Sequence, residues 1–356
     1  MSTSNTKLVL LTGGTGFIGF QTLLDALRAG FRVRCTVRSE AKGEALLSKP
    51  ALQPFLQADN QAPSVEIVVV PDQAARKAFH EAIKGTSYVI HIASPLPSAV
   101  TQANGHLDAE ANFLAPARRT AVEMLEAAAT TTSVERVVMT SSVAAFVSPK
   151  IFMGLMRQDS QHPFTPTSRM PLMTPPFPHS GVAYVASKVE SLAATEAWVK
   201  ETNPRFSVIN IHPSWVMGRA ECAEDVGSLF NTTNRLVLNT IVKGQKSQYP
   251  VMMGAVVDVH DVARMQVQSL QKADIVQPGN CRSFIASTPG IYEDIPGIIR
   301  KSFAEQCQDG RVTILGEQAS FPLPIDSSST EITFGWKFKT LEEMINDLIS
   351  QYIELQ

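Results

Sequence analysis

A tyrosine and a lysine four residues apart, Tyr184 and Lys188, lie in a stretch with helical periodicity. Side chains at this spacing share one face of a helix, so both can reach one ligand. A free phenol has a pKa of about 10, which is too high for rapid proton exchange at neutral pH. A neighbouring ammonium group favours the phenolate and lowers that pKa, as general acid–base catalysis requires. The pair therefore predicts a proton donor, Tyr184, that is tuned by Lys188.

Two serines offer a second chemical group. Ser141 and Ser142 follow an apolar run, Arg136–Met139, that is typical of a buried strand. A serine hydroxyl at the carboxyl end of a parallel strand can donate to a carbonyl oxygen and stabilise a developing alkoxide. Taken alone, these serines could equally cap a helix. Together with Tyr184 and Lys188 they predict a catalytic triad that acts on a carbonyl group.

A glycine-rich turn near the start of the chain predicts where a phosphate would bind. An apolar strand, Leu8–Leu11, runs into Thr12-Gly-Gly-Thr-Gly-Phe-Ile-Gly19, and an amphipathic helical run, Phe17–Ala29, begins within this turn. The glycines permit a tight turn and close approach of the backbone to a pyrophosphate, with the positive end of the helix dipole behind it. We expect a dinucleotide site that contains Gly13, Thr15, Gly16, Phe17, Ile18 and Gly19.

The end of the next strand bears on which dinucleotide binds. A carboxylate there would accept hydrogen bonds from a ribose 2′-hydroxyl and favour NAD. This strand, Arg32–Val37, is followed instead by Arg38, and Lys42 comes one helical turn later. A guanidinium can bind a 2′-phosphate through two hydrogen bonds, so Arg38 and Lys42 favour NADP(H), although Glu40 is close by.

Short β-rich runs alternate with helical stretches through the first two hundred residues. The strands are expected at Leu8–Leu11, Arg32–Val37, Val65–Val70, Tyr88–His91, Arg136–Met139 and Ser207–Ile211. The helices between them are expected at Phe17–Ala29, Gln73–Ile83, Ala109–Ala129 and Ala183–Glu201. This alternation predicts an α/β fold with a doubly wound parallel sheet.

Two regions depart from the alternation. Residues 148–180 are rich in proline and methionine and lead into the helix that carries Tyr184, so we expect a loop that contacts substrate. After Pro213 the pattern is irregular until a last amphipathic helix, Thr340–Tyr352. We therefore expect a cofactor-binding domain over 1–212 and a smaller, mainly substrate-binding region over 213–356, with some segments returning to the first domain.

Composition excludes several other classes of protein. With 356 residues, 44% of them hydrophobic, and a net charge of −2, the chain lacks the basic surface that nucleic acid or an anionic membrane would require. The four cysteines are scattered, which indicates neither a zinc site nor a disulfide framework, and we predict no metal. The short polar N-terminus resembles no signal peptide, and no apolar run could span a bilayer, so we expect a cytoplasmic protein.

These motifs resemble the extended short-chain dehydrogenases/reductases of the NAD-dependent epimerase/dehydratase superfamily over nearly the whole chain. The matching segments are the glycine turn at 12–19, Tyr184 with Lys188, His212–Gly218, Asp258–Ala263 and Phe334–Phe338. Arg38 and the segment His91–Pro95 are most similar to dihydroflavonol reductases, cinnamoyl-CoA reductases and fungal aldehyde or methylglyoxal reductases. Gln73, where relatives carry Leu or Met, and the long proline-rich insertion depart from the family pattern.

The resemblance implies a Rossmann fold and a role for each matching residue. Ser142, rather than Ser141, would polarise the carbonyl, Tyr184 would donate the proton, and Lys188 would tune Tyr184 and hold the ribose. Further cofactor contacts would come from Asp72 beside the adenine, Ala93 and Ser94 at the middle of the cofactor, and Pro213 and Val216 at the carboxamide. The implied activity is NADPH-dependent reduction of a ketone or aldehyde, with a small carbonyl compound as substrate and a monomer or homodimer as the assembly.

Two other functions share part of this pattern. A sugar-nucleotide epimerase or dehydratase would retain the turn and the Tyr/Lys pair, but usually has tightly bound NAD and an acid in place of Arg38. A non-catalytic NADP(H) sensor would commonly lack the Tyr/Lys pair.

His91 and His212 are expected to be structural residues. Trp215 fits either the core or the pocket wall. His260 with Asp261 is expected to begin a helix rather than bind metal.

Overall fold

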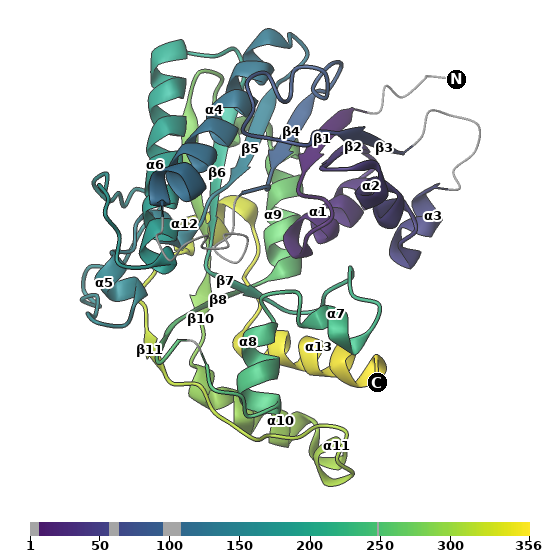
Figure 1. Cartoon of the computed structure of the whole chain (residues 1–356), viewed down its shortest axis with the longest axis vertical. Helices are drawn as coiled ribbons and strands as arrows, with labels where there is room; N and C mark the ends of the chain where they lie inside the picture. The colour runs from purple at the N-terminus through teal and green to yellow at the C-terminus, as the bar shows by residue number, and fades with distance from the viewer. Residues whose placement is uncertain (1–6, 57–63, 95–107, 248) are drawn as a thin grey trace. The chain divides into compact units, whose positions relative to one another are not determined.

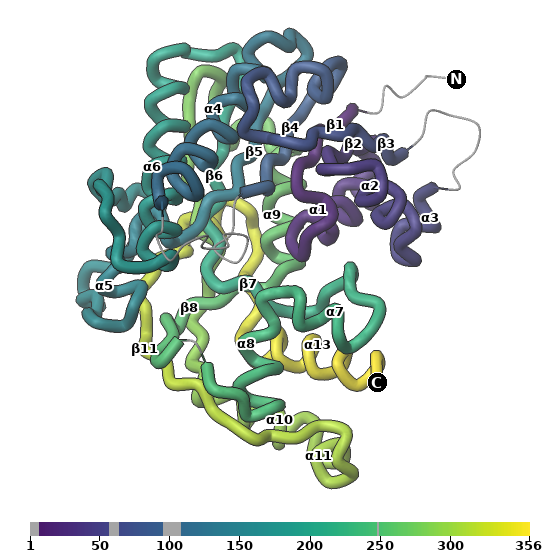
Figure 2. Tube along the Cα trace, in the orientation of Figure 1, coloured from purple at the N-terminus to yellow at the C-terminus, as the bar shows by residue number. Residues whose placement is uncertain are grey.

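The computed structural model describes residues 7–56, 64–94, 108–247 and 249–356. The chain forms two compact units (Figures 1 and 2). The first unit comprises Met1–Phe146, Arg169–His212 and Ala263–Phe284, and the second comprises Val147–Ser168, Pro213–Val262 and Ile285–Gln356. Part of the proline-rich insertion therefore belongs to the second unit, and a late segment returns to the first.

A seven-stranded sheet forms the core of the first unit, in the order β3-β2-β1-β4-β5-β6-β9. Its strands are β1 Leu8–Thr12, β2 Arg32–Val37, β3 Val65–Val69, β4 Tyr88–His91, β5 Arg136–Thr140, β6 Ser207–Pro213 and β9 Cys281–Ala286. Strands β1 to β6 pair in parallel, as the alternating sequence pattern predicts. The predicted α/β fold with a doubly wound parallel sheet is confirmed. The sequence pattern did not predict β9, in which only the last three residues are buried.

Helices cover both faces of this sheet. Those of the first unit are α1 Phe17–Arg28, α2 Glu40–Leu47, α3 Gln53–Leu56, the π-helix Glu110–Leu114, α4 Ala115–Thr130, α6 Ser180–Thr202 and most of α9 Val259–Gln271. Met139 of β5 belongs to the apolar cluster that α4 and α6 form with the sheet. Thr140, the next residue, contacts Gln266 of α9. Because neighbouring strand residues point to opposite faces, α9 lies on the other face from α4.

The helix predicted over Gln73–Ile83 is wrong, since the structure has consecutive turns there. Its hydrogen bonds mostly span three residues, as from Ala78 N to Ala75 O and from His80 N to Lys77 O. Lys77 adopts a left-handed φ of 62°, which a continuous right-handed helix cannot include. The apolar periodicity of this segment reflects burial of Phe79 and Ile83 in the core rather than helical structure.

The second unit is built on a smaller sheet around β8 Met252–Asp258, which pairs with β7 Trp215–Met217, β10 Thr288–Pro289 and β11 Ser320–Pro322. Its helices are α5 Pro149–Phe152, α7 Val226–Leu229, α8 Arg235–Val237, the π-helix Leu238–Val242, α10 Ile295–Ser302, α11 Ala304–Gln308, α12 Ser328–Phe334 and α13 Leu341–Glu354. The predicted final helix is α13, and Thr340 and Glu343 begin it with a reciprocal capping box. His260 and Asp261 do begin a helix, α9.

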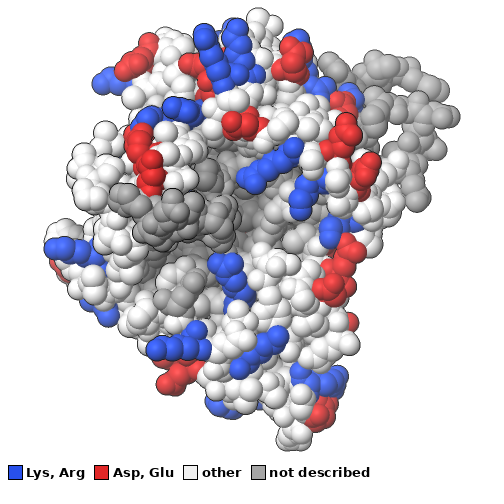
Figure 3. Space-filling model, in the orientation of Figure 1, with Lys and Arg blue, Asp and Glu red and all other residues white. Residues whose placement is uncertain are grey.

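Charged side chains are mixed on the face drawn in Figure 3, where Lys and Arg occur together with Asp and Glu. In the described part of the chain, no helix combines the length and the apolar character needed to cross a membrane. Within the same residues, no group of three His, Cys, Asp or Glu side chains could hold a metal ion.

Candidate active site

The glycine turn joins β1 to α1 with no room for side chains at its centre. A Cβ atom on Gly19 would lie 2.0 Å from the carbonyl oxygen of Gly13, and Gly13 itself has a φ of +79°. Gly16 occupies the N-cap of α1, where no side chain caps the helix. Thr15 and Gly16 are exposed. An exposed helix N-terminus behind a glycine-rich turn fits a dinucleotide pyrophosphate.

Thr12 connects this turn to the end of β4. Its hydroxyl oxygen accepts hydrogen bonds from the backbone N–H groups of Ile92 and Ala93, each at 3.1 Å. The same oxygen lies 2.9 Å from Nδ1 of His91. Burial and the nearby Lys188 charge lower the pKa of His91 to about 3, so its ring is neutral. The hydrogen bond between Ala93 N and the Thr12 hydroxyl holds Ala93 directly beside the glycine turn. A Cβ on Gly13 would lie 3.1 Å from the backbone N of Ala93.

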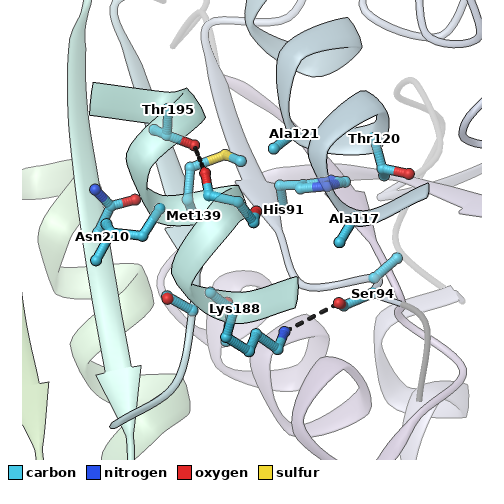
Figure 4. Close-up of a pocket in the computed structure, with 14 residues that line it drawn as sticks. His91, Ser94, Ala117, Thr120, Ala121, Met139, Lys188, Thr195 and Asn210 are labelled. Atoms are coloured by element: carbon cyan, nitrogen blue, oxygen red, sulfur yellow. Dashed lines mark hydrogen bonds between the residues drawn. The ribbon is translucent and has the colours of Figure 1, made fainter. Parts of the chain in front are cut away.

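Lys188 lies on α6 with its ammonium group turned toward this same edge. Nζ donates a hydrogen bond to Ser94 Oγ at 3.0 Å (Figure 4). Nζ is also 5.5 Å from the centroid of the Tyr184 ring. Burial lowers the pKa of Lys188 to about 8, because the charged form loses its hydration. Tyr184 and Lys188 are therefore brought together, with Ser94 as a third member that the spacing alone did not indicate.

Lys188 lines a pocket, and all the lining residues of this pocket belong to the first unit. Strands β4, β5 and β6 and helices α4 and α6 contribute to it (Figure 4). Its polar lining consists of His91, Ser94, Thr120, Thr140, Ser141, Lys188, Ser191, Thr195 and Asn210. No carboxylate lines the pocket in the described part of the chain, so it suits neutral or negatively charged hydrogen-bonding groups.

The two candidate serines have different surroundings. Ser142 Oγ caps a short 3-10 helix, Val143–Ala145, by accepting a hydrogen bond from Ala144 N at 3.1 Å. A serine hydroxyl that accepts one hydrogen bond can still donate another, and the 3-10 helix packs against α6. Ser141 instead lines the same pocket as Lys188, and its backbone N–H donates a hydrogen bond to the carbonyl oxygen of Ile211.

His212 fixes the backbone of Ser142. Its Nδ1 lies 3.3 Å from the Ser142 carbonyl oxygen, which can only accept, so Nδ1 carries the proton and donates it. Burial, as the largest cause, lowers the pKa of His212 to about 3. Local sequence patterns offered no signal for this contact, because 70 residues separate the two partners.

The residues expected at the adenosine end lie at the surface of the first unit. Arg38 follows β2 and is exposed, and no carboxylate among the described residues forms an ion pair with it. Ser39 caps α2 and accepts a hydrogen bond from Lys42 N at 3.4 Å, so Arg38 and Lys42 flank one helix start. Asp72 is exposed and accepts a hydrogen bond from Ala74 N. Gln73 reaches β2 through Thr36.

Pro213 and Val216 are buried and belong to the second unit, at the end of β6 and within β7. Between them, Trp215 packs edge-on against Tyr249 and donates from Nε1 to Thr233 O. Pro95, the last residue of the segment that resembles the reductases, lies outside the described residues.

A comparison with protein-family models matches residues 9–281 to the NAD dependent epimerase/dehydratase family. The chain belongs to this family. Because the matched range spans more than half of the chain, including the glycine turn, Tyr184 and Lys188, the resemblance inferred from the motifs is confirmed.

Three proteins illustrate what this member of the epimerase/dehydratase family is similar to. Ketoreductase CTB6 of Cercospora nicotianae is 35% identical, over 98% of this chain and 96% of that protein. Putative NADPH-dependent methylglyoxal reductase GRP2 of Candida albicans is 29% identical, over 99% of this chain and 100% of that protein. The crystal structure of yeast methylglyoxal/isovaleraldehyde reductase Gre2 complexed with NADPH has the same fold, with a TM-score of 0.76, 23% identity and 98% of each chain covered.

Gln266 is a residue of this family member that the sequence analysis did not single out. Its side-chain amide has no solvent exposure. Its oxygen accepts from Thr22 of α1 at 2.5 Å, and its nitrogen donates to Thr140 at the end of β5 at 2.7 Å. It thus connects the helix behind the glycine turn to the strand that leads into Ser142.

Proposed function

We propose that this protein is an NADPH-dependent reductase that converts a ketone or aldehyde to an alcohol. The observation that carries the proposal is the buried Lys188 ammonium group, which lies beside the Tyr184 ring and bonds to Ser94 next to the glycine turn. Proton donor, cation and phosphate cradle thus occur at one edge of one sheet. Relatives named as a ketoreductase and as an NADPH-dependent methylglyoxal reductase support the same activity.

The proposed chemistry assigns one role to each side chain. A reduced nicotinamide, when bound, supplies the hydride that the carbonyl carbon accepts. Ser142 donates a hydrogen bond to the carbonyl oxygen and stabilises its developing negative charge. Tyr184 transfers its phenolic proton to that oxygen, a contribution of about 10²–10⁴-fold. The positive charge of Lys188 stabilises the phenolate that remains.

The cofactor would be held along the same edge of the sheet. The turn formed by Gly13, Thr15, Gly16, Phe17, Ile18 and Gly19 would bind the pyrophosphate, because its glycines leave the backbone N–H groups at the start of α1 open to approach. Asp72 would bind the adenosine end, Ala93 and Ser94 the middle, and Lys188 the ribose of the nicotinamide end. Arg38 and Lys42 favour a 2′-phosphate, since both are exposed at one helix start and no carboxylate competes for Arg38 among the described residues.

A turnover assay tests this proposal. NADPH absorbance is followed with a panel of small dicarbonyls, aryl aldehydes and bulky β-keto esters, with NADH in parallel. We expect consumption with NADPH, a loss of about 10²–10⁴-fold in Tyr184→Phe, and a loss of about 10²–10³-fold in Ser142→Ala but not in Ser141→Ala. Full activity of Tyr184→Phe would overturn the mechanism.

The same purified protein separates the two competing functions. Tightly bound NAD in its absorbance spectrum, with no turnover on the panel, would instead indicate a sugar-nucleotide epimerase or dehydratase. NADPH binding without any turnover would indicate a sensor. The proposal also includes a cytoplasmic location and a monomer or homodimer, which fractionation and light scattering would test.

A further inference from the structure

An apolar cluster lies against the proposed proton donor. Its buried members come from the π-helix region and from α6, and they are Ala109, Phe113, Leu114, Ala183 and Ala186. Three half-buried side chains pack against them: Met173, Phe177 and Tyr184. All of these residues belong to the first unit. Tyr184 therefore has an apolar flank in addition to the polar flank formed by Lys188 and Ser94.

A π-helix carries two members of this cluster, Phe113 and Leu114. Pro116 has no backbone N–H, so it cannot complete the hydrogen bond to residue 112 that an α-helix would require. The chain forms a wider turn instead, in which Ala115 N donates to Glu110 O. Such local π-helical turns recur at functional sites. Here the π-helical turn supplies a buried aromatic side chain, Phe113, to the cluster against which Tyr184 packs.

The proline-rich insertion supplies the other side of the cluster. Between Pro171 and His179, Met173 and Phe177 are the half-buried residues, and the rest of this stretch is exposed. Leu172, for example, is 64% exposed although it is just as apolar. Position in the chain and hydrophobicity are thus matched for Leu172 and Met173, but of the two only Met173 packs against the cluster that Tyr184 also contacts.

An ion pair holds this segment in place. The Arg169 guanidinium bonds to both carboxylate oxygens of Glu196 on α6, with Nε at 3.1 and 3.0 Å. A side-chain fork that grips a carboxylate in this way fixes orientation as well as position. The segment that follows Arg169 is therefore tied to the helix that carries Tyr184.

We propose that Met173 and Phe177 determine substrate specificity by accepting an apolar, preferentially aromatic, group attached to the carbonyl carbon. This inference rests on the function proposed above, since it concerns the same site. Both side chains are only half buried, so each keeps apolar surface that a substrate can cover. A ring favours contacts with an aromatic edge and with a thioether sulfur. A charged or sugar-like group would lose its hydration there without gaining partners.

The test compares diacetyl with its phenyl analogue, in which a phenyl ring replaces one methyl group. For the wild type, kcat/KM should be about ten- to a hundredfold higher for the phenyl analogue, the range expected from burying an aromatic ring. Phe177→Ala and Met173→Ala should each lower kcat/KM for the phenyl analogue by about tenfold and leave diacetyl within about twofold. The matched control Leu172→Ala should change neither value, and melting temperatures confirm that each variant is folded.

Two results would overturn the specificity role: a wild type that prefers diacetyl, or variants that lose activity equally on both substrates. If none of the carbonyl compounds tested leads the wild type to consume NADPH, this result contradicts the proposed function instead. In that case calorimetry with benzyl alcohol and NADP⁺-loaded protein still decides the inference. Binding that is weakened in Phe177→Ala supports the apolar subsite, and an absence of binding by the wild type rejects it.

Discussion

Lys188 Nζ donates a hydrogen bond to Ser94 Oγ across 3.0 Å, although 94 residues separate the two in the chain. The bond joins the helix that carries Tyr184 to the end of β4. Thr12 ties the same end of β4 to the glycine turn through the backbone of Ile92 and Ala93. The glycine turn and the helix that carries Tyr184 are therefore connected through the hydroxyl groups of Thr12 and Ser94.

The buried ammonium group of Lys188 should make stability depend on pH. Its pKa is lowered by burial from 10.5 to about 8 in the folded protein. Between these values the unfolded chain binds a proton that the folded chain has released. The free energy of unfolding contributed by Lys188 therefore rises as the pH increases from about 8 to about 10.

The measurement is the melting temperature of wild type and Lys188→Met in the absence of cofactor, from pH 7 to 10. The difference between the two isolates Lys188 from other groups that titrate in this range. The melting temperature of the wild type should rise relative to that of Lys188→Met as the pH increases. A constant difference would show that Lys188 keeps its ordinary pKa.

Gly19 should tolerate no side chain. A Cβ there would lie 2.0 Å from Gly13 O, so the turn would have to open, and misplacement by about 1 Å can cost 10²-fold in activity. We expect Gly19→Ala to lose NADPH affinity on that scale, and Gly16→Ala, whose Cβ would lie 3.4 Å from the same oxygen, to lose less. Fluorescence titration measures both. Gly297→Ala is the control, because a Cβ there would meet nothing within 4 Å. Equal NADPH affinities of Gly19→Ala, Gly16→Ala and Gly297→Ala would contradict phosphate binding at the glycine turn.

Arg38 should discriminate between the two nicotinamide cofactors. Removing a charged hydrogen bond costs about 1.5–3 kcal/mol, so Arg38→Ala should weaken NADPH binding by about 10- to 100-fold. NADH affinity should not change, because its ribose 2′-hydroxyl carries no charge. Lys42→Ala is expected to have a smaller effect in the same direction. A parallel loss for NADH would show that Arg38 has a structural role.

Gln266 should stabilise the first unit through its two threonine partners. Gln266→Leu keeps the volume but leaves Thr22 and Thr140 without the amide, at a cost of about 1–3 kcal/mol. The melting temperature should fall by about 2–4 °C for each kcal/mol. Gln271, exposed on the same helix, provides the control variant Gln271→Leu. If both variants have the same melting temperature as the wild type, the hydrogen bonds of the Gln266 amide contribute nothing to stability.

The sequence by itself determined the elements whose formation is local. Apolar runs predicted strands β1 to β6 within one or two residues at each end, because a buried parallel strand needs continuous hydrophobic residues. The glycine turn was also predictable, since the positive φ of Gly13 and the close approach of Gly19 to the Gly13 carbonyl oxygen both require glycine. The spacing of Tyr184 and Lys188 placed both on one helical face before any tertiary contact was known.

Only the tertiary structure decided which distant groups meet. The bonds from Lys188 to Ser94, from His212 to Ser142 and from Gln266 to Thr22 and Thr140 join segments that no local pattern relates. The prediction of a helix at 73–83 was wrong for the same reason, since the apolar residues of this segment are spaced to contact the core and do not indicate a helix. Local propensity sets which elements form, whereas burial and the pairing of polar groups across the fold set the chemistry of the site.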